Sequence, residues 1–125
     1  MQSDGGELSS CINATTLAFM DAGIPIKNLL CACTAAFVYS RTANDMIANI
    51  QPQLLLDVNN TELSRMNRSV CLNLALQGNT NDAVMWSLER GKVTSDVMSE
   101  LFHLATKGCH IIRNIVHEYC HKIYN

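Results

Sequence analysis

The first part of the chain carries an apolar pattern with helical period. Apolar or small side chains recur at steps of three and four residues, which places them on one face of a helix. Gly23 suits the left-handed position after the last turn, and Pro25 prevents continuation. We therefore predict a helix from about Leu8 to Ala22, with a core-facing stripe of Leu8, Cys11, Ile12, Thr15, Phe19 and Ala22.

The next apolar segments have the length and composition of strands. Leu29–Tyr39 is rich in Cys, Thr, Phe and Val without helical period, which indicates a strand buried on both faces. Shorter strands are predicted at Gln53–Val58, Ser69–Leu76 and Ala83–Leu88, and the turn formers of Gln77–Asp82 join the last two as a hairpin. The polar stretches Ser40–Asn49 and Asn59–Arg68 are predicted to be loops.

A long helix follows the hairpin. Thr94 or Ser95 is a suitable N-cap, and the helical pattern runs to about His121. Its apolar stripe predicts a helix packed along its whole length, through Val97, Leu101, Leu104, Gly108, Ile111, Ile112, Ile115 and Tyr119.

The order helix, four strands, helix predicts an α/β fold of two layers. In this arrangement a four-stranded sheet carries both helices on one face, and residues 1–125 form a single domain. A helix that leads into a buried strand usually has a strand before it, and none precedes Leu8 here.

Composition and charge narrow the class of protein. The 125 residues are 48% hydrophobic and 16% charged, which is too apolar for a disordered chain, and no run approaches the ~18 apolar residues of a membrane span. Low charge with high apolar content indicates a large core or a partner that covers apolar surface. The net charge is −2, whereas a domain that grips nucleic acid unaided is normally basic. We therefore expect contact with RNA only within a larger assembly.

Six cysteines are present, and the N-terminus lacks the charged start and apolar core of a signal peptide. They are expected to be reduced thiols of a cytosolic or nuclear protein. Cys31 and Cys33 have alternate spacing on a predicted strand, whereas metal or redox pairs normally have two intervening residues. Burial as small hydrophobic residues is the interpretation that we favour for this pair.

The segment from His117 to His121 matches the pattern H-E-x-x-H, in which two histidines one turn apart bind zinc and the glutamate acts as base. His117, Glu118 and His121 are therefore candidate metal ligands, and a zinc hydrolase is one alternative function. The pattern ends four residues before the C-terminus, so a downstream third ligand has no chain to occupy. His103 and His110 continue the same helix edge at seven-residue spacing, which favours an ordinary helix flank without a metal.

Longer motifs carry a resemblance to a known family. Asp4-Gly5-Gly6 is followed by Cys11–Ala18, by the turn Asp21–Pro25 and by the strand Cys31–Val38; Leu56–Asn59 and Ala105–Ile112 come later. Together they resemble the RNase PH family, and within it the ring subunits of the RNA exosome. The resemblance implies an RNase PH-like fold, similar to the second domain of ribosomal protein S5. The family's domain has another half before the Asp-Gly-Gly motif, so the chain resembles the C-terminal portion of such a domain.

The resemblance also implies where catalytic residues would lie. Active family members degrade RNA from its 3′ end with inorganic phosphate, and they use two aspartates six residues apart after the Leu-Asp-x-Asn strand. Alignment from Asp57 places Leu63 and Ser69 at these positions, and neither can usefully transfer a proton or hold a metal ion. Glu62 is the nearest carboxylate and could substitute if the alignment shifts by one residue.

Arg65 and Arg68 lie in the same segment. The simpler interpretation is a solvated loop. The alternative is that both arginines contact RNA phosphates where a catalytic pocket would otherwise lie.

The resemblance, together with the residues at positions 63 and 69, implies a non-catalytic RNase PH-like subunit of the RNA exosome, a structural ring component in 3′–5′ RNA processing and degradation, without a cofactor. It also implies other RNase PH-like subunits and single-stranded RNA in the assembled channel as partners, no membrane contact, and a location in the nucleus, nucleolus and cytoplasm. An isolated fragment with an unpaired strand edge could form homodimers. An active phosphorolytic 3′–5′ exoribonuclease and the zinc hydrolase remain the alternatives.

Overall fold

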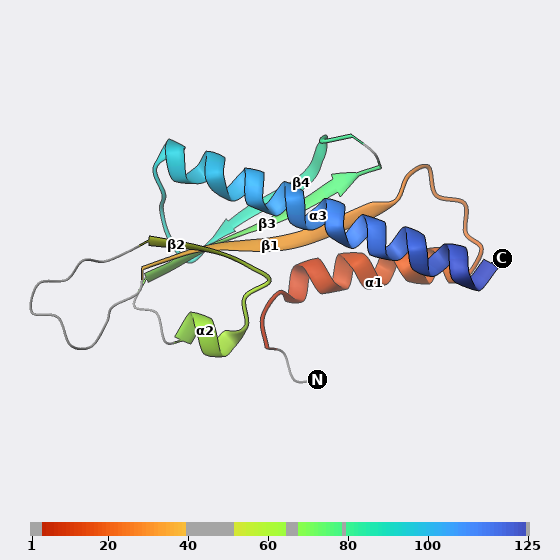
Figure 1. The fold of residues 1–125 in the computed structure, drawn as a ribbon, viewed down its shortest axis with the longest axis horizontal. Helices are drawn as coiled ribbons and strands as arrows, with labels where there is room; N and C mark the ends of the chain where they lie inside the picture. The colour runs from red at the N-terminus through yellow and green to blue at the C-terminus, as the bar shows by residue number, and fades with distance from the viewer. Residues whose placement is uncertain (1–3, 40–51, 65–67, 79, 125) are drawn as a thin grey trace, which may run out of the picture.

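The computed structural model describes residues 4–39, 52–64, 68–78 and 80–124. The elements in chain order (Figure 1) are α1 (Glu7–Asp21), β1 (Leu30–Tyr39), β2 (Pro52–Leu56), α2 (Asn60–Ser64), β3 (Arg68–Gln77), β4 (Ala83–Glu89) and α3 (Ser95–Tyr124). The predicted helices and strands are confirmed to within a few residues. The short helix α2 lies in the stretch Asn59–Arg68, where the sequence predicts a loop, and the predicted loop Ser40–Asn49 lies outside the described residues.

A four-stranded antiparallel sheet with the order β2-β1-β3-β4 confirms the α/β class. β1 pairs along its whole length with β3, whereas β2 pairs only with Ala35–Tyr39 of β1. Every residue of β1 from 31 to 38 is buried. The prediction of a strand buried on both faces is therefore confirmed, and each face of β1 needs its own cover.

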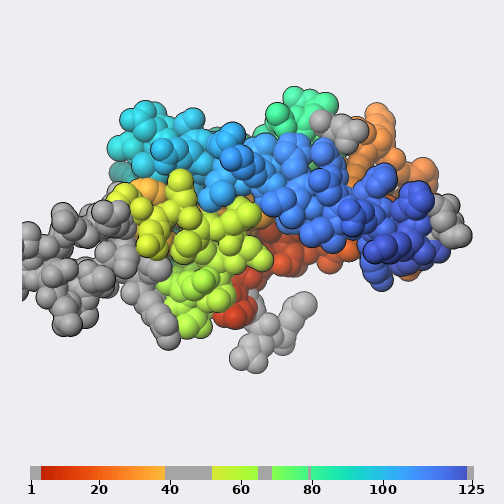
Figure 2. Space-filling model, viewed as in Figure 1, coloured from red at the N-terminus to blue at the C-terminus, as the bar shows by residue number. Residues whose placement is uncertain are grey.

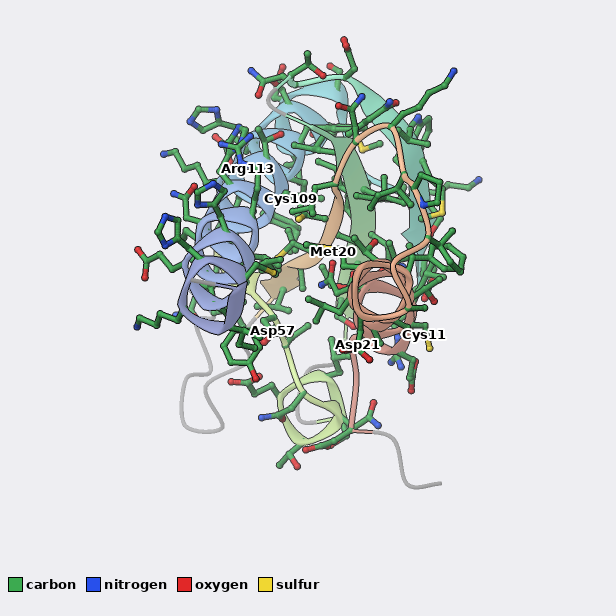
Figure 3. The ribbon with its side chains drawn as sticks, turned by 90° about the vertical axis from the view of Figure 1, so that its right-hand side faces the viewer. Cys11, Met20, Asp21, Asp57, Cys109 and Arg113 are labelled. Carbon is green, nitrogen blue, oxygen red and sulfur yellow. The ribbon has the colours of Figure 1, made fainter. Side chains whose placement is uncertain are left out.

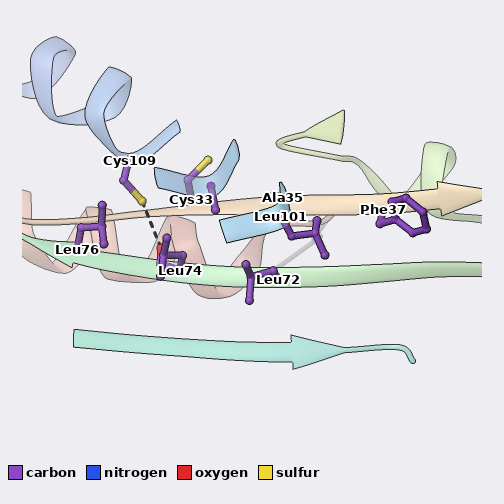
Figure 4. Packing of buried hydrophobic residues seen from close by; sticks show 9 residues of the cluster. Cys33, Ala35, Phe37, Leu72, Leu74, Leu76, Leu101 and Cys109 are labelled. Carbon is purple, nitrogen blue, oxygen red and sulfur yellow. Dashed lines mark hydrogen bonds between the residues drawn. The ribbon is translucent and has the colours of Figure 1, made fainter. Parts of the chain in front are cut away.

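α3 covers one face of the sheet. Its buried residues form a cluster with alternate residues of β1 and β3 (Figure 4), and the members are Cys33, Ala35, Phe37, Leu72, Leu74, Leu76, Leu101, Ala105 and Cys109. Gly108 permits the close approach of the helix, because a Cβ there would lie 2.5 Å from Sγ of Cys33. A larger residue at this position would push α3 away from β1.

α1 lies on the opposite face. Successive side chains of a strand point to opposite faces, and Thr34, the neighbour of Cys33, contacts Ser9 of α1 with 2.7 Å between the two hydroxyl oxygens. Seen from the end of the molecule, α1 and α3 stand on either side of the sheet (Figure 3). The prediction that both long helices share one face is therefore wrong, and the fold has three layers.

Polar side chains attach α1 to the sheet. Its buried residues are Ser9 and Thr16; the Thr16 hydroxyl donates to the carbonyl of Leu30 (2.9 Å). Asn13 accepts from the backbone N–H of Ala32 (2.8 Å) and donates to the carbonyl of the same residue (2.9 Å). These bonds satisfy the edge of β1 that β2 leaves unpaired, as a neighbouring strand would.

The predicted apolar stripe of α1 is therefore rotated away from the sheet. Leu8 and Phe19 are 38% and 43% exposed, and Cys11, Thr15 and Ala22 are also exposed. The expectation that this stripe forms the core face is wrong, because hydrogen bonds to the β1 edge decide which side of the helix faces inward.

The predicted stripe of α3 is correct only in the first half of the helix. Ile111, Ile115 and Tyr119 are 55%, 61% and 60% exposed, so the helix is not packed along its whole length. Arg113 donates a hydrogen bond to the carbonyl of Gly78 (3.0 Å), one residue beyond the end of β3. The rest of α3 therefore extends past the sheet.

Several large apolar side chains of α1 and α3 are exposed, among them Phe19, Ile115 and Tyr119. The space-filling view shows the elongated body (Figure 2). Within the described residues, no helix is long and apolar enough to cross a membrane. The exposed apolar faces of α1 and α3 are surfaces that a partner can cover.

The first prediction concerns the β1 edge. Asn13→Leu removes two hydrogen bonds and leaves the backbone of Ala32 without partners, so we expect the free energy of unfolding to fall by about 2–3 kcal/mol, measured by urea denaturation. Thr15→Ala is the control, because the exposed Thr15 hydroxyl bonds only to the carbonyl of Cys11 within α1. Equal stability of the Asn13→Leu and wild-type proteins would contradict this role.

The second prediction concerns the cysteines, all of which are free thiols. Burial is the main cause that raises the pKa of Cys33 to about 11 and that of Cys109 to about 12 from 9.0. At about pH 8, iodoacetamide should modify the exposed Cys11 and leave both buried thiols unmodified until the protein unfolds. Peptide mass spectrometry measures the modification, and rapid labelling of Cys109 in the folded protein would refute the prediction.

The same shifts give a pH dependence of stability. Well below pH 9.0 these thiols are protonated in both the folded and unfolded chains, so they leave the free energy of unfolding unchanged. Above pH 9.0 they ionise first in the unfolded chain, and the stability should fall as the pH rises. A Cys109→Ala variant should lose part of this alkaline dependence.

Candidate functional site

A pocket of about 70 Å³ lies where the N-terminus of α1 meets α2 and the adjacent ends of β3 and β4. Its walls include Gly5, Gly6, Leu63, Asn73, Glu89 and Arg90. We take it as the candidate functional site, because it contains one of the two positions to which the sequence resemblance assigns catalytic carboxylates.

The Asp4-Gly5-Gly6 motif forms one wall through its backbone. Gly5 has φ 107°, and a Cβ there would lie 2.6 Å from the carbonyl oxygen of Val58, so only glycine fits. The carbonyl of Asp4 accepts a hydrogen bond from the N–H of Asn60 at 2.7 Å. The start of α1 is therefore held directly against the start of α2.

α2 is fixed by a reciprocal cap. The N–H of Asn59 donates to the carboxylate of Glu62 (2.9 Å), and the N–H of Glu62 donates to the side-chain oxygen of Asn59 (2.8 Å). This is the geometry of a capping box, and the spacing of Asn59 and Glu62 is the signal that could have predicted α2. The Glu62 carboxylate is exposed and holds the helix start.

The two positions expected to be degenerate lie in different surroundings. Leu63 is 7% exposed and packs in an apolar cluster with Ala36, Val38, Val58 and Cys71. Ser69 is 9% exposed on β3, opposite Val38 of β1. Neither position offers a carboxylate, and the side chain at position 63 is part of the core.

A line of buried polar groups leads from α1 to the charged wall of the pocket. Thr34 donates to the side-chain oxygen of Asn73 (2.8 Å), so the Ser9 hydroxyl donates to Thr34. The Asn73 amide donates to the Glu89 carboxylate (2.8 Å) and to Ser87 (3.2 Å). This network fixes the Glu89 carboxylate at the end of β4, next to Arg90, which follows the strand with φ 71°.

Sequence reasoning did not find this network. Its signal is a polar residue inside an otherwise apolar strand, as at Thr34 in β1 and Asn73 in β3, which are both 5% exposed. Buried polar groups need partners, and every buried side-chain polar atom among the described residues has one. The pocket therefore has a fixed carboxylate at Glu89, with Glu7 and Arg90 also in its lining, and neither carboxylate stands at position 63 or 69.

The other predicted site residues lie elsewhere. Arg65 is outside the described residues, and Arg68 begins β3 with a side chain that is also outside them, so their contact with RNA stays a prediction. His117, Glu118 and His121 are exposed on α3, which extends past the sheet. Among the described residues, no three His, Cys, Asp or Glu side chains come together as metal ligands.

The sheet, its helices and the pocket at the Asp-Gly-Gly motif define an α/β protein with the RNase PH-like arrangement. Over 114 residues the chain is 36% identical to the exosome complex component ski6 of Schizosaccharomyces pombe, a match that covers 91% of this chain and 40% of that protein. Over 118 residues it is 32% identical to the exosome complex component RRP41 homolog of Arabidopsis thaliana, with 94% and 43% covered. A shorter match to the exosome complex component RRP41 of Mus musculus is 50% identical over 46 residues, 37% of this chain and 19% of that protein.

No model of a known protein family matches the chain. The relatives nevertheless match across most of its length, so the chain is a homologue of RNase PH-like exosome components. It spans about two-fifths of the length of the long-matching relatives. The family resemblance found in the sequence is confirmed.

The third prediction tests the core role of Leu63. Leu63→Asp places a carboxylate in an apolar cluster without a partner, so we expect the free energy of unfolding to fall by about 3–5 kcal/mol. Ser64→Asp, at the exposed neighbouring position, should change it by less than about 0.5 kcal/mol. Urea denaturation measures both variants, and equal effects would show that Leu63 is not part of the core.

Proposed function

We propose that the chain acts as a non-catalytic RNase PH-like subunit of the RNA exosome, a structural ring component in 3′–5′ RNA processing and degradation. The observation that carries the proposal is the pair of positions Leu63 and Ser69. The first is packed in an apolar cluster and the second is a nearly buried serine, where active relatives need two carboxylates. The names of the relatives support the exosome as the assembly.

The proposed partners are other RNase PH-like subunits in a ring and single-stranded RNA in its channel, in the nucleus, nucleolus and cytoplasm. We also propose that the chain forms the C-terminal portion of a larger RNase PH-like domain. The long-matching relatives are more than twice as long, and the exposed apolar residues of α1 and α3 fit a surface that the rest of such a domain and neighbouring subunits cover. Homodimerisation through the same surfaces is the alternative for the isolated chain.

An active phosphorolytic exoribonuclease is the alternative that the pocket makes specific. Its acid would have to be Glu62 on α2, or Glu7 or Glu89 in the pocket lining. Glu62 already caps α2, and Glu89 accepts a hydrogen bond from Asn73. To act as the acid, Glu62 or Glu89 would have to transfer a proton during RNA cleavage while it makes its present hydrogen bond.

The fourth prediction tests this proposal on the tagged protein purified from its own cells with its partners. We expect RNase PH-like components to copurify, and any phosphate-dependent release of nucleoside diphosphates from single-stranded RNA to be unchanged by Glu62→Gln and Glu89→Gln. Glu118→Gln on α3 is the matched control. Loss of release in either pocket variant, with the control intact, would establish the active enzyme.

Metal analysis of the same preparation tests the second alternative, a zinc hydrolase. A zinc hydrolase requires stoichiometric zinc that is lost in a His117→Ala variant. Purification without any exosome component would contradict the proposed assembly.

A further inference from the structure

A second, larger hollow lies at the end of the molecule away from the pocket at the Asp4-Gly5-Gly6 motif. This groove of about 800 Å³ forms where the last turn of α1, the segment before β1, the turn after β3 and the second half of α3 meet. Figure 3 views this end, with Met20 on α1 and Arg113 on α3. Because α1 has 15 residues, it separates the groove from the Asp-Gly-Gly pocket by about 20 Å.

The charged residues that line the groove are Lys27, from the segment before β1, and Arg113, from α3. His117 of α3 adds an imidazole ring to the wall. No carboxylate among the described residues lines it, and the neutral polar groups in its walls belong to Asn28, Thr80 and Asn114. The whole chain has a net charge of −2, so this local positive charge is unlike the surface average.

Gly78 gives the groove a rigid floor. Its N–H donates to the carbonyl of Leu29 (2.8 Å), and its carbonyl accepts from Arg113 (3.0 Å). The side chain of Asn28 would lie 3.2 Å from a Cβ at this glycine, which has φ 60°. Arg113 is half-buried and is held by one of its five N–H donors. A guanidinium fixed in this way can offer further donors to a ligand with little loss of conformational entropy.

We infer that this groove binds phosphate ester groups. A guanidinium, an ammonium and amide side chains are the groups that bind phosphate oxygens in proteins. The described lining contains no Phe, Tyr or Trp side chain on which a base could stack. Recognition would therefore be of the phosphate and independent of base sequence.

We favour single-stranded RNA as the source of the phosphate, and this choice rests on the proposed exosome role. The inference of a phosphate site rests only on the residues that line the groove. In an assembled ring the groove would make phosphate contacts separate from those predicted for Arg65 and Arg68. The net charge of the isolated chain predicts weak overall affinity, so the test depends on comparing variants and on the salt dependence.

The fifth prediction is measured by fluorescence anisotropy of labelled single-stranded RNA with the full chain, between about 50 and about 200 mM salt. We expect Lys27→Ala to weaken binding about three- to tenfold for oligo(A) and oligo(U) alike, and to reduce the slope of log affinity against log salt by about 0.7. The double variant Lys27→Ala/His117→Ala should bind more weakly still. Lys107→Ala, at an exposed position of α3 outside the groove, is the matched control and should bind as the wild type does.

Lys27 and His117 are exposed, so their variants should fold, and circular dichroism verifies this. Arg113→Lys keeps the charge but loses the guanidinium fork, and it should bind less tightly than the wild type and more tightly than Arg113→Gln. Competition by ADP at a concentration equal to that of RNA phosphate would indicate a site for one free phosphate ester. Competition by RNA alone would indicate the nucleic-acid backbone.

Wild-type binding by the double variant, or an equal loss in Lys107→Ala, would overturn the inference. These outcomes are distinct from failure of the proposed function. A chain that does not copurify with exosome components, yet loses phosphate-ester binding in Lys27→Ala, would retain the groove without the exosome role.

Discussion

The attachment of α1 to the edge of β1 determines much of this structure. β2 pairs with only half of the central strand, and Asn13 and Thr16 supply the hydrogen bonds that the other half lacks. Because these polar side chains must face the strand, the apolar side of α1 faces outward. The same contact places Gly5 and Gly6 against α2 and builds the pocket at the start of the helix.

The pocket is built on a framework of backbone and buried side-chain contacts. Glycines with positive φ, a capped α2 and a buried network through Thr34 and Asn73 are all structural requirements of the backbone arrangement. Leu63 belongs to this framework as well, since it fills the cluster beneath α2. These contacts are needed whether or not the pocket performs chemistry, because they join α1, α2 and the sheet.

The sequence predicts the elements well and their orientation less well. Periodicity and turn residues locate both long helices and all four strands, since these signals are local. The apolar stripe of α1 is misleading because Ser9, Asn13 and Thr16 have the same helical spacing on another side of the helix. For the site, the motif and alignment predict that position 63 lacks an acid. They do not reveal the Asn73–Glu89 contact or the groove at Arg113, since residues far apart in the chain form both.

The second half of α3 contributes to two different surfaces, an exposed apolar stripe and one wall of the groove. Beyond Arg113, α3 has no sheet beneath it, and it carries exposed apolar residues on one side and His117 on another. An exposed apolar stripe is typical of a surface that another protein covers, whereas a groove lined with Lys27, Arg113 and amide side chains suits a hydrated anion. If a neighbour covers Ile111, Ile115 and Tyr119, it fixes the free half of α3, and with it one wall of the groove. Assembly would then strengthen phosphate binding by ordering the site, without any direct contact between the partner and the phosphate.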